Sequence, residues 1–214
     1  MGLAGLALAA LSFFAASPQQ GSSPKSSNPA EAARLNNLGA AYMNQQLFEK
    51  GLKAFEEAAA LDPKLQAARM NQGIALLNLG KVDPAKQILE DAVKRDPKNP
   101  HALYNLGLLE KNSSDSQAAV EVFRRVTEID PNDADTWYFL GTVYSQLKDF
   151  PPAIEAFNTA LKLNPLHASA QFGLSRAYQQ SADTAHAREH LGRFQYITQH
   201  KLGAAISLAY GEQG

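Results

Sequence analysis

Residues Trp137 to Tyr144 read "WYFLGTVY", and this arrangement of large apolar residues around a Leu-Gly pair returns along the chain at a fixed interval. The glycine recurs every 34 residues, at Gly39, Gly73, Gly107 and Gly141. Two further series keep the same interval: Pro29, Pro63, Pro97, Pro131 and Pro165, and Ala85, Ala119, Ala153 and Ala187. Chance does not place three series in one register, so the chain is built from repeated units.

Each unit predicts two helices joined by a short turn. Counting the first helices from residues 32, 66, 100 and 134, the fourth, seventh, eighth and eleventh positions share one helical face. The closing Asp-Pro or Asn-Pro dipeptide ends the second helix, because a residue before proline is pushed out of the α region. In "DPKNPHAL", Asn99 fits the N-cap of the next helix and Pro100 fits its first turn. We expect Gly107 to let the helix that carries Phe123 approach closely.

The pattern resembles the tetratricopeptide repeat, in which Trp, Leu, Gly and Tyr lie on a first helix and Ala, Phe, Ala and Pro on a second. The fourth unit matches at every position, with Trp137, Leu140, Gly141, Tyr144, Ala153, Phe157, Ala160 and Pro165. The second unit departs at Arg69 and Gln72, and the third has Glu110 in place of the tyrosine. The resemblance implies an all-α fold, an α-solenoid of antiparallel helix pairs with four full repeats and one degenerate repeat, and a concave surface.

The repeats define the predicted organisation of the chain. The array covers 29–200, with repeats near 32–65, 66–99, 100–133, 134–167 and 168–200. Before it, 1–17 is an uncharged apolar segment typical of a signal peptide, because as a helix it is too short to cross a bilayer core of about 30 Å. We expect 18–28 to be a flexible linker. The tail, 201–214, is similar to a junction into an FG-GAP-type β-propeller of exported bacterial proteins, which would make the chain a fragment.

Composition narrows the function. The net charge of -1 gives no electrostatic footprint for nucleic acid, and the absence of cysteine excludes disulfides and thiolate metal sites. His186 and His190 are four residues apart but lack a third ligand, so we interpret them as solvated surface residues. No phosphate loop or nucleophile elbow appears in the sequence. We therefore expect no enzyme activity, no metal, no cofactor and no small-molecule substrate.

The other face of the first helices carries the candidate binding residues. In this family that face lines the concave groove. Here it holds an apolar stripe, formed by Met70, Tyr104, Tyr138 and Phe172, and an asparagine ladder, formed by Asn37, Asn71 and Asn105, with Phe139 at the ladder position of the fourth repeat. An amide ladder can pair with the main chain of an extended peptide. Two alternatives stay open, namely packing between repeats for the aromatic residues and solvated polar sites for the asparagines. A clamp for a terminal carboxylate is not expected, because Lys111 and Arg176 are isolated.

These observations favour a non-catalytic scaffold that binds a partner protein or an extended peptide in its concave groove. One alternative is a structural subunit that self-associates, and another is the regulatory arm of a larger exported propeller or enzyme. The apolar N-terminal segment predicts export to a bacterial periplasm or to the extracellular space. The alternatives are an uncleaved N-terminal anchor, which would be the only link to a membrane, a mispredicted start of the chain, and a plain N-terminal helix.

Overall fold

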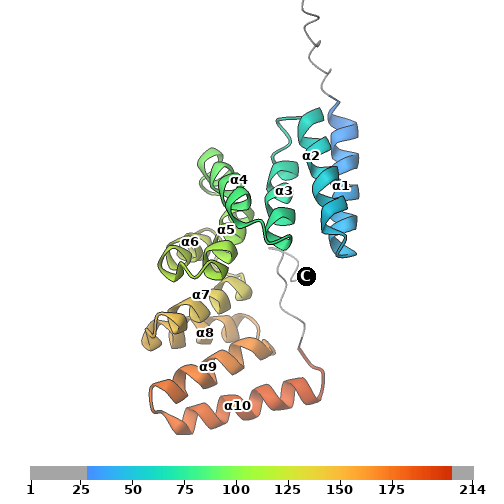
Figure 1. Cartoon of the computed structure of the whole chain (residues 1–214). Helices are drawn as coiled ribbons and strands as arrows, with labels where there is room; N and C mark the ends of the chain where they lie inside the picture. The colour runs from blue at the N-terminus through green and yellow to red at the C-terminus, as the bar shows by residue number, and fades with distance from the viewer. Residues whose placement is uncertain (1–27, 204–214) are drawn as a thin grey trace, which may run out of the picture.

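The computed structural model describes residues 28–203, which form ten α-helices and no strand (Figure 1). In chain order the helices are α1 (Pro29–Asn44), α2 (Phe48–Leu61), α3 (Gln66–Asn78), α4 (Val82–Arg95), α5 (Pro100–Asn112), α6 (Ser116–Ile129), α7 (Ala134–Gln146), α8 (Phe150–Leu163), α9 (Ala168–Gln180) and α10 (Thr184–Gln199). They alternate as first and second members of five pairs, so the predicted α-solenoid is confirmed. The signal-like segment, 1–17, most of the linker and the tail from residue 204 lie outside the described residues.

The helix pairs stack in chain order into an elongated array. Each helix packs against the next, and the first helices of neighbouring repeats also meet, as α1 meets α3 and α7 meets α9. Figure 1 shows α1 and α2 at one end of the array and α9 and α10 at the other. Between residues 28 and 203, no helix combines the length and the apolar character needed to cross a membrane.

Local sequence explains where the helices start and turn. Asn99 Oδ1 accepts a hydrogen bond of 3.1 Å from the Ala102 amide, which confirms the predicted cap of α5. Each turn within a pair contains one residue with positive φ, and these keep the 34-residue interval: Gln46, Gly80, Ser114, Lys148 and Ala182. Four of the five are not glycine. The packed helices therefore impose this left-handed turn even on residues that disfavour it.

The close helix contact predicted at Gly107 is present. A Cβ atom built on Gly107 would lie 2.8 Å from the ring of Phe123 on α6, well inside van der Waals contact. The equivalent position in the second repeat is less tight, because Gly73 faces the aliphatic side chains of Ile88 and Leu89, with nearest atoms at 3.2 Å. Gly107 therefore offsets its low helix propensity by allowing a large ring to pack on the α5 backbone.

The third repeat departs from the apolar core at Glu110. This residue replaces the tyrosine of the pattern, is buried, and places Oε1 2.8 Å from Nζ of Lys86 on α4. The hydrogen bond that Lys86 donates to the Glu110 carboxylate raises the pKa of Lys86. The other carboxylate oxygen, Oε2, is buried without a hydrogen-bond partner in the described structure. The ion pair thus ties α4 to α5 and replaces the packing that an aromatic ring gives in the fourth repeat.

Candidate functional site

A cavity lies over the first helices α7 and α9. It has a volume of about 740 Å³ and is bounded by α8 and α10 as well. We call it the α7–α9 groove. Its lining residues are Tyr138, Thr142, Ser145, Gln146, Lys148, Phe150, Phe157, Ser169, Phe172, Gly173, Arg176, Ala177, Gln180 and Phe194. Its size falls in the range of about 300 to 1,000 Å³ that is usual for binding sites.

Aromatic rings form the apolar walls of the groove. Phe172 on α9 is 41% exposed and its ring centroid lies 5.1 Å from that of Phe194 on α10. Across the groove, the ring of Tyr138 lies 6.0 Å from that of Phe157. Gly173 explains how Phe157 reaches this place, because a Cβ there would lie only 2.6 Å from the Phe157 ring. An exposed aromatic wall of this kind is a typical anchor surface for a partner side chain.

The polar part of the lining carries positive charge. Lys148 and Arg176 are the charged residues among the fourteen that line the groove, and none of these fourteen is acidic. The guanidinium carbon of Arg176 lies 6.0 Å from the centroid of the Phe172 ring, within cation–π range. Thr142 and Ser145 donate their hydroxyl hydrogens to carbonyls of their own helix, so they present mainly apolar surface. The groove therefore suits an apolar segment that also carries a carboxylate.

A buried polar pair, His167 and Asp135, packs against the ring of Tyr138. His167 Nδ1 accepts a hydrogen bond from the Ala170 amide, so its Nε2 carries the proton and donates to Asp135 Oδ1 at 2.9 Å. The His167 ring lies 5.0 Å from that of Tyr138. The pair caps α9, fastens it to α7 and holds the tyrosine ring in place. Asp135 and His167 are 32 positions apart in the sequence, and no local pattern predicts their contact.

Two of the predicted groove residues, Tyr104 of the stripe and Phe139 beside it, lie in the core and not on an open wall. Tyr104 is 0% exposed, and its ring meets Phe123 and Phe139 edge-on, with centroids 6.1 and 5.8 Å away. Phe139 is buried as well and stacks on Phe123 at 5.8 Å. This corrects the expectation of a continuous stripe, because packing between repeats takes up both rings. Met70 is partly buried against the same core, so of the five predicted apolar residues only Tyr138 and Phe172 line the groove.

The predicted asparagine ladder is not a uniform feature. Asn37 is exposed, whereas Asn71 donates from Nδ2 to Asn36 Oδ1 at 2.9 Å. Asn105 is 4% exposed and donates from Nδ2 to the His101 carbonyl, one turn earlier on its own helix, at 2.8 Å. The burial of Asn105 corrects its assignment to an open peptide-binding face. Equivalent registers in successive repeats thus meet different surroundings.

The histidines differ from the prediction of two solvated residues. His186 is on the surface and pairs with Asp183, but His190 is 8% exposed and its Nδ1 lies 2.7 Å from Oε1 of Gln171. Burial lowers the pKa of His190. Both rings stack on Tyr178, so the pair forms part of the packing between α9 and α10. In the described part of the chain, no group of three His, Cys, Asp or Glu residues is placed to hold a metal.

Sequence reasoning missed Lys148 and Phe194 as groove residues. Lys148 lies in the left-handed turn between α7 and α8, whereas the predicted groove residues all lie on first helices. Phe194 comes from α10, the second helix of its pair, and so likewise lies outside the first helices. Its signal was present in the sequence, because it replaces the last small alanine of the repeat pattern with a large ring.

Comparison with known families gives three matches. Models described as "Tetratricopeptide repeat" match residues 32–65, 70–134 and 134–166, so together they cover more than half of the chain and nearly all of its first four repeats. No curated protein sequence matches the chain.

Solved structures share the arrangement of the helices. A structure of MamA from Desulfovibrio magneticus RS-1 is 23% identical, with a TM-score of 0.73 over 81% of this chain and 98% of that chain. Another crystal structure of MamA is 22% identical, with a TM-score of 0.69 over 76% and 95% of the two chains. YrrB, described as a TPR protein with an unusual peptide-binding site, is 20% identical, with a TM-score of 0.65 over 78% and 87%. At these identities the likeness is one of fold.

Proposed function

Because this chain belongs to the tetratricopeptide repeat family, we propose that it is a non-catalytic interaction scaffold that holds an extended peptide segment of a partner protein in the α7–α9 groove. The family consists in general of protein-interaction modules, and one of the similar structures is described by its peptide-binding site. The observation that carries the proposal is the exposed ring of Phe172, which faces a cavity of about 740 Å³ without an acidic residue in its lining.

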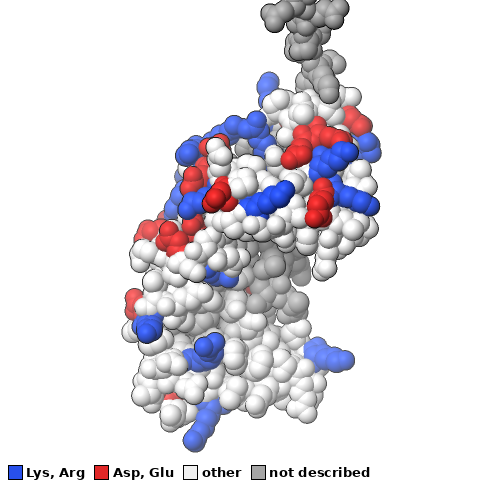
Figure 2. Space-filling view, viewed as in Figure 1, with Lys and Arg blue, Asp and Glu red and all other residues white. Residues whose placement is uncertain are grey.

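The chemistry of the lining defines the peptide. Phe172 with Phe194 offers one apolar contact area, and Tyr138, which packs on the buried ring of Phe157, offers a second; both suit large apolar side chains such as Leu or Phe. Lys148 and Arg176 favour a carboxylate between or beside them. Figure 2 supports a division of the surface, because on the face in view acidic and basic side chains gather over α1–α4 and extend to α6, while the surface of α7–α10 is mainly uncharged. We therefore propose a segment that combines large apolar residues with Asp or Glu.

Panning a library of random peptides on the chain, followed by fluorescence anisotropy of the selected peptides, tests this proposal. Phe172→Ala and Tyr138→Ala should each weaken binding by about tenfold or more, which is about 1.4 kcal/mol, as expected for interface anchors. Tyr196→Ala is the matched control, because Tyr196 is an exposed aromatic outside the groove lining. Selected peptides whose affinity is unchanged by both groove variants would contradict the proposal. Light scattering separates this function from self-association of the chain.

We also propose that the scaffold works outside the cytoplasm. The support is the uncharged apolar run of residues 2–17 followed by a Ser, Gln, Gly and Pro-rich segment. Mass spectrometry of the protein from fractionated cells tests it. A mature protein that has lost 1–17, or an intact protein in a membrane fraction that faces outward, is the expected result, and intact protein in the cytosol would contradict it.

A further inference from the structure

A second cavity lies between α2, α3 and α4, at the place where the second repeat departs from the family pattern. In the first, third and fourth repeats, the fourth and seventh positions of the first helix are large and apolar: Leu35 and Leu38, Leu103 and Leu106, and Trp137 and Leu140. The second repeat has Arg69 and Gln72 instead. Both residues line a cavity of about 270 Å³, together with Ala59, Ala60, Gln66, Ile88, Asp91, Ala92 and Arg95. We call this cavity the arginine pocket.

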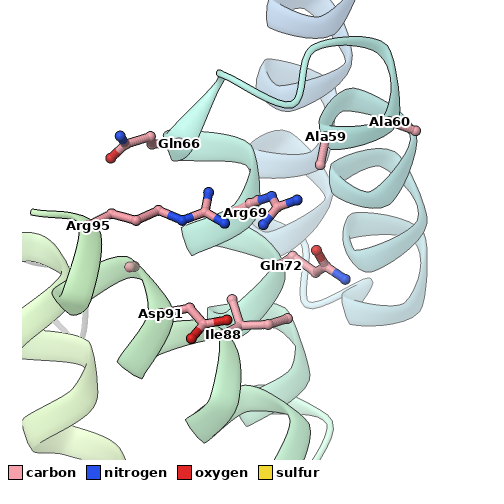
Figure 3. A pocket seen from close by; sticks show the side chains of 9 residues that line it. Ala59, Ala60, Gln66, Arg69, Gln72, Ile88, Asp91 and Arg95 are labelled. Atoms are coloured by element: carbon pink, nitrogen blue, oxygen red, sulfur yellow. The ribbon is translucent and has the colours of Figure 1, made fainter. Parts of the chain in front are cut away.

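The arginine pocket is separate from the α7–α9 groove. It is built by the first two repeats, and on the wheel of α3 its residues Arg69 and Gln72 lie opposite the groove-facing positions. Figure 3 shows Arg95 extending from the end of α4 toward α3, and Arg69 of α3 projecting into the same pocket. Gln72 and Asp91 line the opposite side of the pocket. Small residues of α2 and α4 leave room for these long side chains.

The two guanidinium groups carry charge that the described chain does not neutralise. Among residues 28–203, neither Arg69 nor Arg95 forms an ion pair with an acidic side chain. Asp91 also lines the pocket, but its carboxylate faces Lys94 at 3.5 Å on its own helix. A guanidinium presents several N–H donors in a planar fork that matches a carboxylate or a phosphate. Two of them in one cavity make a receptor for an anion.

We propose that the arginine pocket binds the carboxylate of an acidic side chain from a partner protein. Asp91 in the lining repels either anion, and it repels a phosphate more strongly because a phosphate carries more negative charge than a carboxylate. Ala59, Ala60, Ile88 and Ala92 provide apolar walls for the methylene groups of a Glu side chain, and the amides of Gln66 and Gln72 can donate further hydrogen bonds.

The test uses the full chain with three probes: a short acetylated and amidated peptide of alternating Leu and Glu, the same peptide with Gln for Glu, and inorganic phosphate. Binding is followed by the NMR signals of the arginine Nε–H groups. We expect the Glu peptide to shift the signals of Arg69 and Arg95, and the Gln peptide and phosphate to bind at least about tenfold more weakly. Tighter binding of phosphate, or equal binding of the Gln peptide, would overturn the proposal.

Variants separate the pocket from general electrostatic attraction. Arg69→Leu restores the residue of the first and third repeats and Arg95→Gln keeps a polar side chain, and each should weaken the Glu peptide by about tenfold. Arg124→Gln, on the exposed surface of α6, removes the same charge elsewhere and should change nothing. An equal loss of affinity for the Glu peptide in all three variants would overturn the proposal. An unchanged affinity in Arg95→Gln would overturn it as well, and this variant decides the test if Arg69→Leu does not fold. The outcome is independent of peptide binding in the α7–α9 groove.

Discussion

Replacing a single glycine by alanine should have opposite effects in two repeats of the same register. Gly107 and Gly73 both occupy the eighth position of a first helix, so in either case alanine raises helix propensity by about 1 kcal/mol. The two sites differ in what the new methyl group meets. At Gly107 it meets an aromatic ring, and at Gly73 it meets branched aliphatic chains.

The distances set the magnitude of each effect. The alanine Cβ at position 107 would lie 2.8 Å from the Phe123 ring, so the ring has to move by about 0.7 Å or more to reach ordinary contact near 3.5 Å. Phe123 is fully buried and stacks on Phe139, so overpacking should cost about 1 to 3 kcal/mol and exceed the gain in propensity. At Gly73 the nearest atoms, at 3.2 Å, belong to Ile88 and Leu89, whose smaller displacement should cost less than the gain.

Urea unfolding followed by circular dichroism measures the difference. Gly73→Ala should unfold at a urea concentration equal to or above that of the parent, and Gly107→Ala below it. Midpoints are compared instead of extrapolated free energies, because repeat arrays often unfold in more than one step. A midpoint for Gly107→Ala at or above that of Gly73→Ala would refute the claim that the ring contact determines which residue the position accepts.

Two further predictions concern buried charge. Lys86→Ala should lower the free energy of unfolding by about 1 to 3 kcal/mol, because it leaves the buried Glu110 carboxylate unpaired. The double variant Lys86→Met with Glu110→Tyr should recover most of the loss. A Lys86→Ala variant as stable as the parent in urea unfolding would contradict this. Burial holds the pKa of His190 below its ordinary value, so the unfolded chain takes up a proton first and stability should fall as the pH drops below about 6.5. Thermal melts at several pH values should show a smaller fall for His190→Gln, and parallel falls would exclude His190 as the source.

The positions of the helices could be predicted from the sequence because the repeat signals are local. The residue before proline leaves the α region, Asn99 caps the helix that follows it, and glycine at position eight marks a close helix contact, whichever neighbours the helix later acquires. The shared interval then assigns the same fold to every unit, including the fifth, which lacks the closing proline. Even the left-handed turn residues keep that interval, although only Gly80 among them carries the usual signal.

The candidate sites depended on contacts between repeats, which the shared register does not encode. Tyr104 and Phe172 occupy the same position of their helices, yet Tyr104 is buried between Phe123 and Phe139, while Phe172 faces the α7–α9 groove. Asn71 and Asn105 likewise share a register but bond to different partners. The residues that surround each of these side chains differ from repeat to repeat, so the pattern of one repeat could not predict the contacts in another.

The sequence by itself determined the family, the helix pairs and the close helix contacts, because each follows from residues that are adjacent or share one helix face. The tertiary structure alone decided which registers became core and which became surface. It brought Phe194 from a second helix into the groove, joined His167 to Asp135 behind Tyr138, and left Arg69 and Arg95 facing one cavity. The physical reason is that burial depends on how neighbouring helices stack, and the sizes and charges of side chains far apart in the chain set that stacking repeat by repeat.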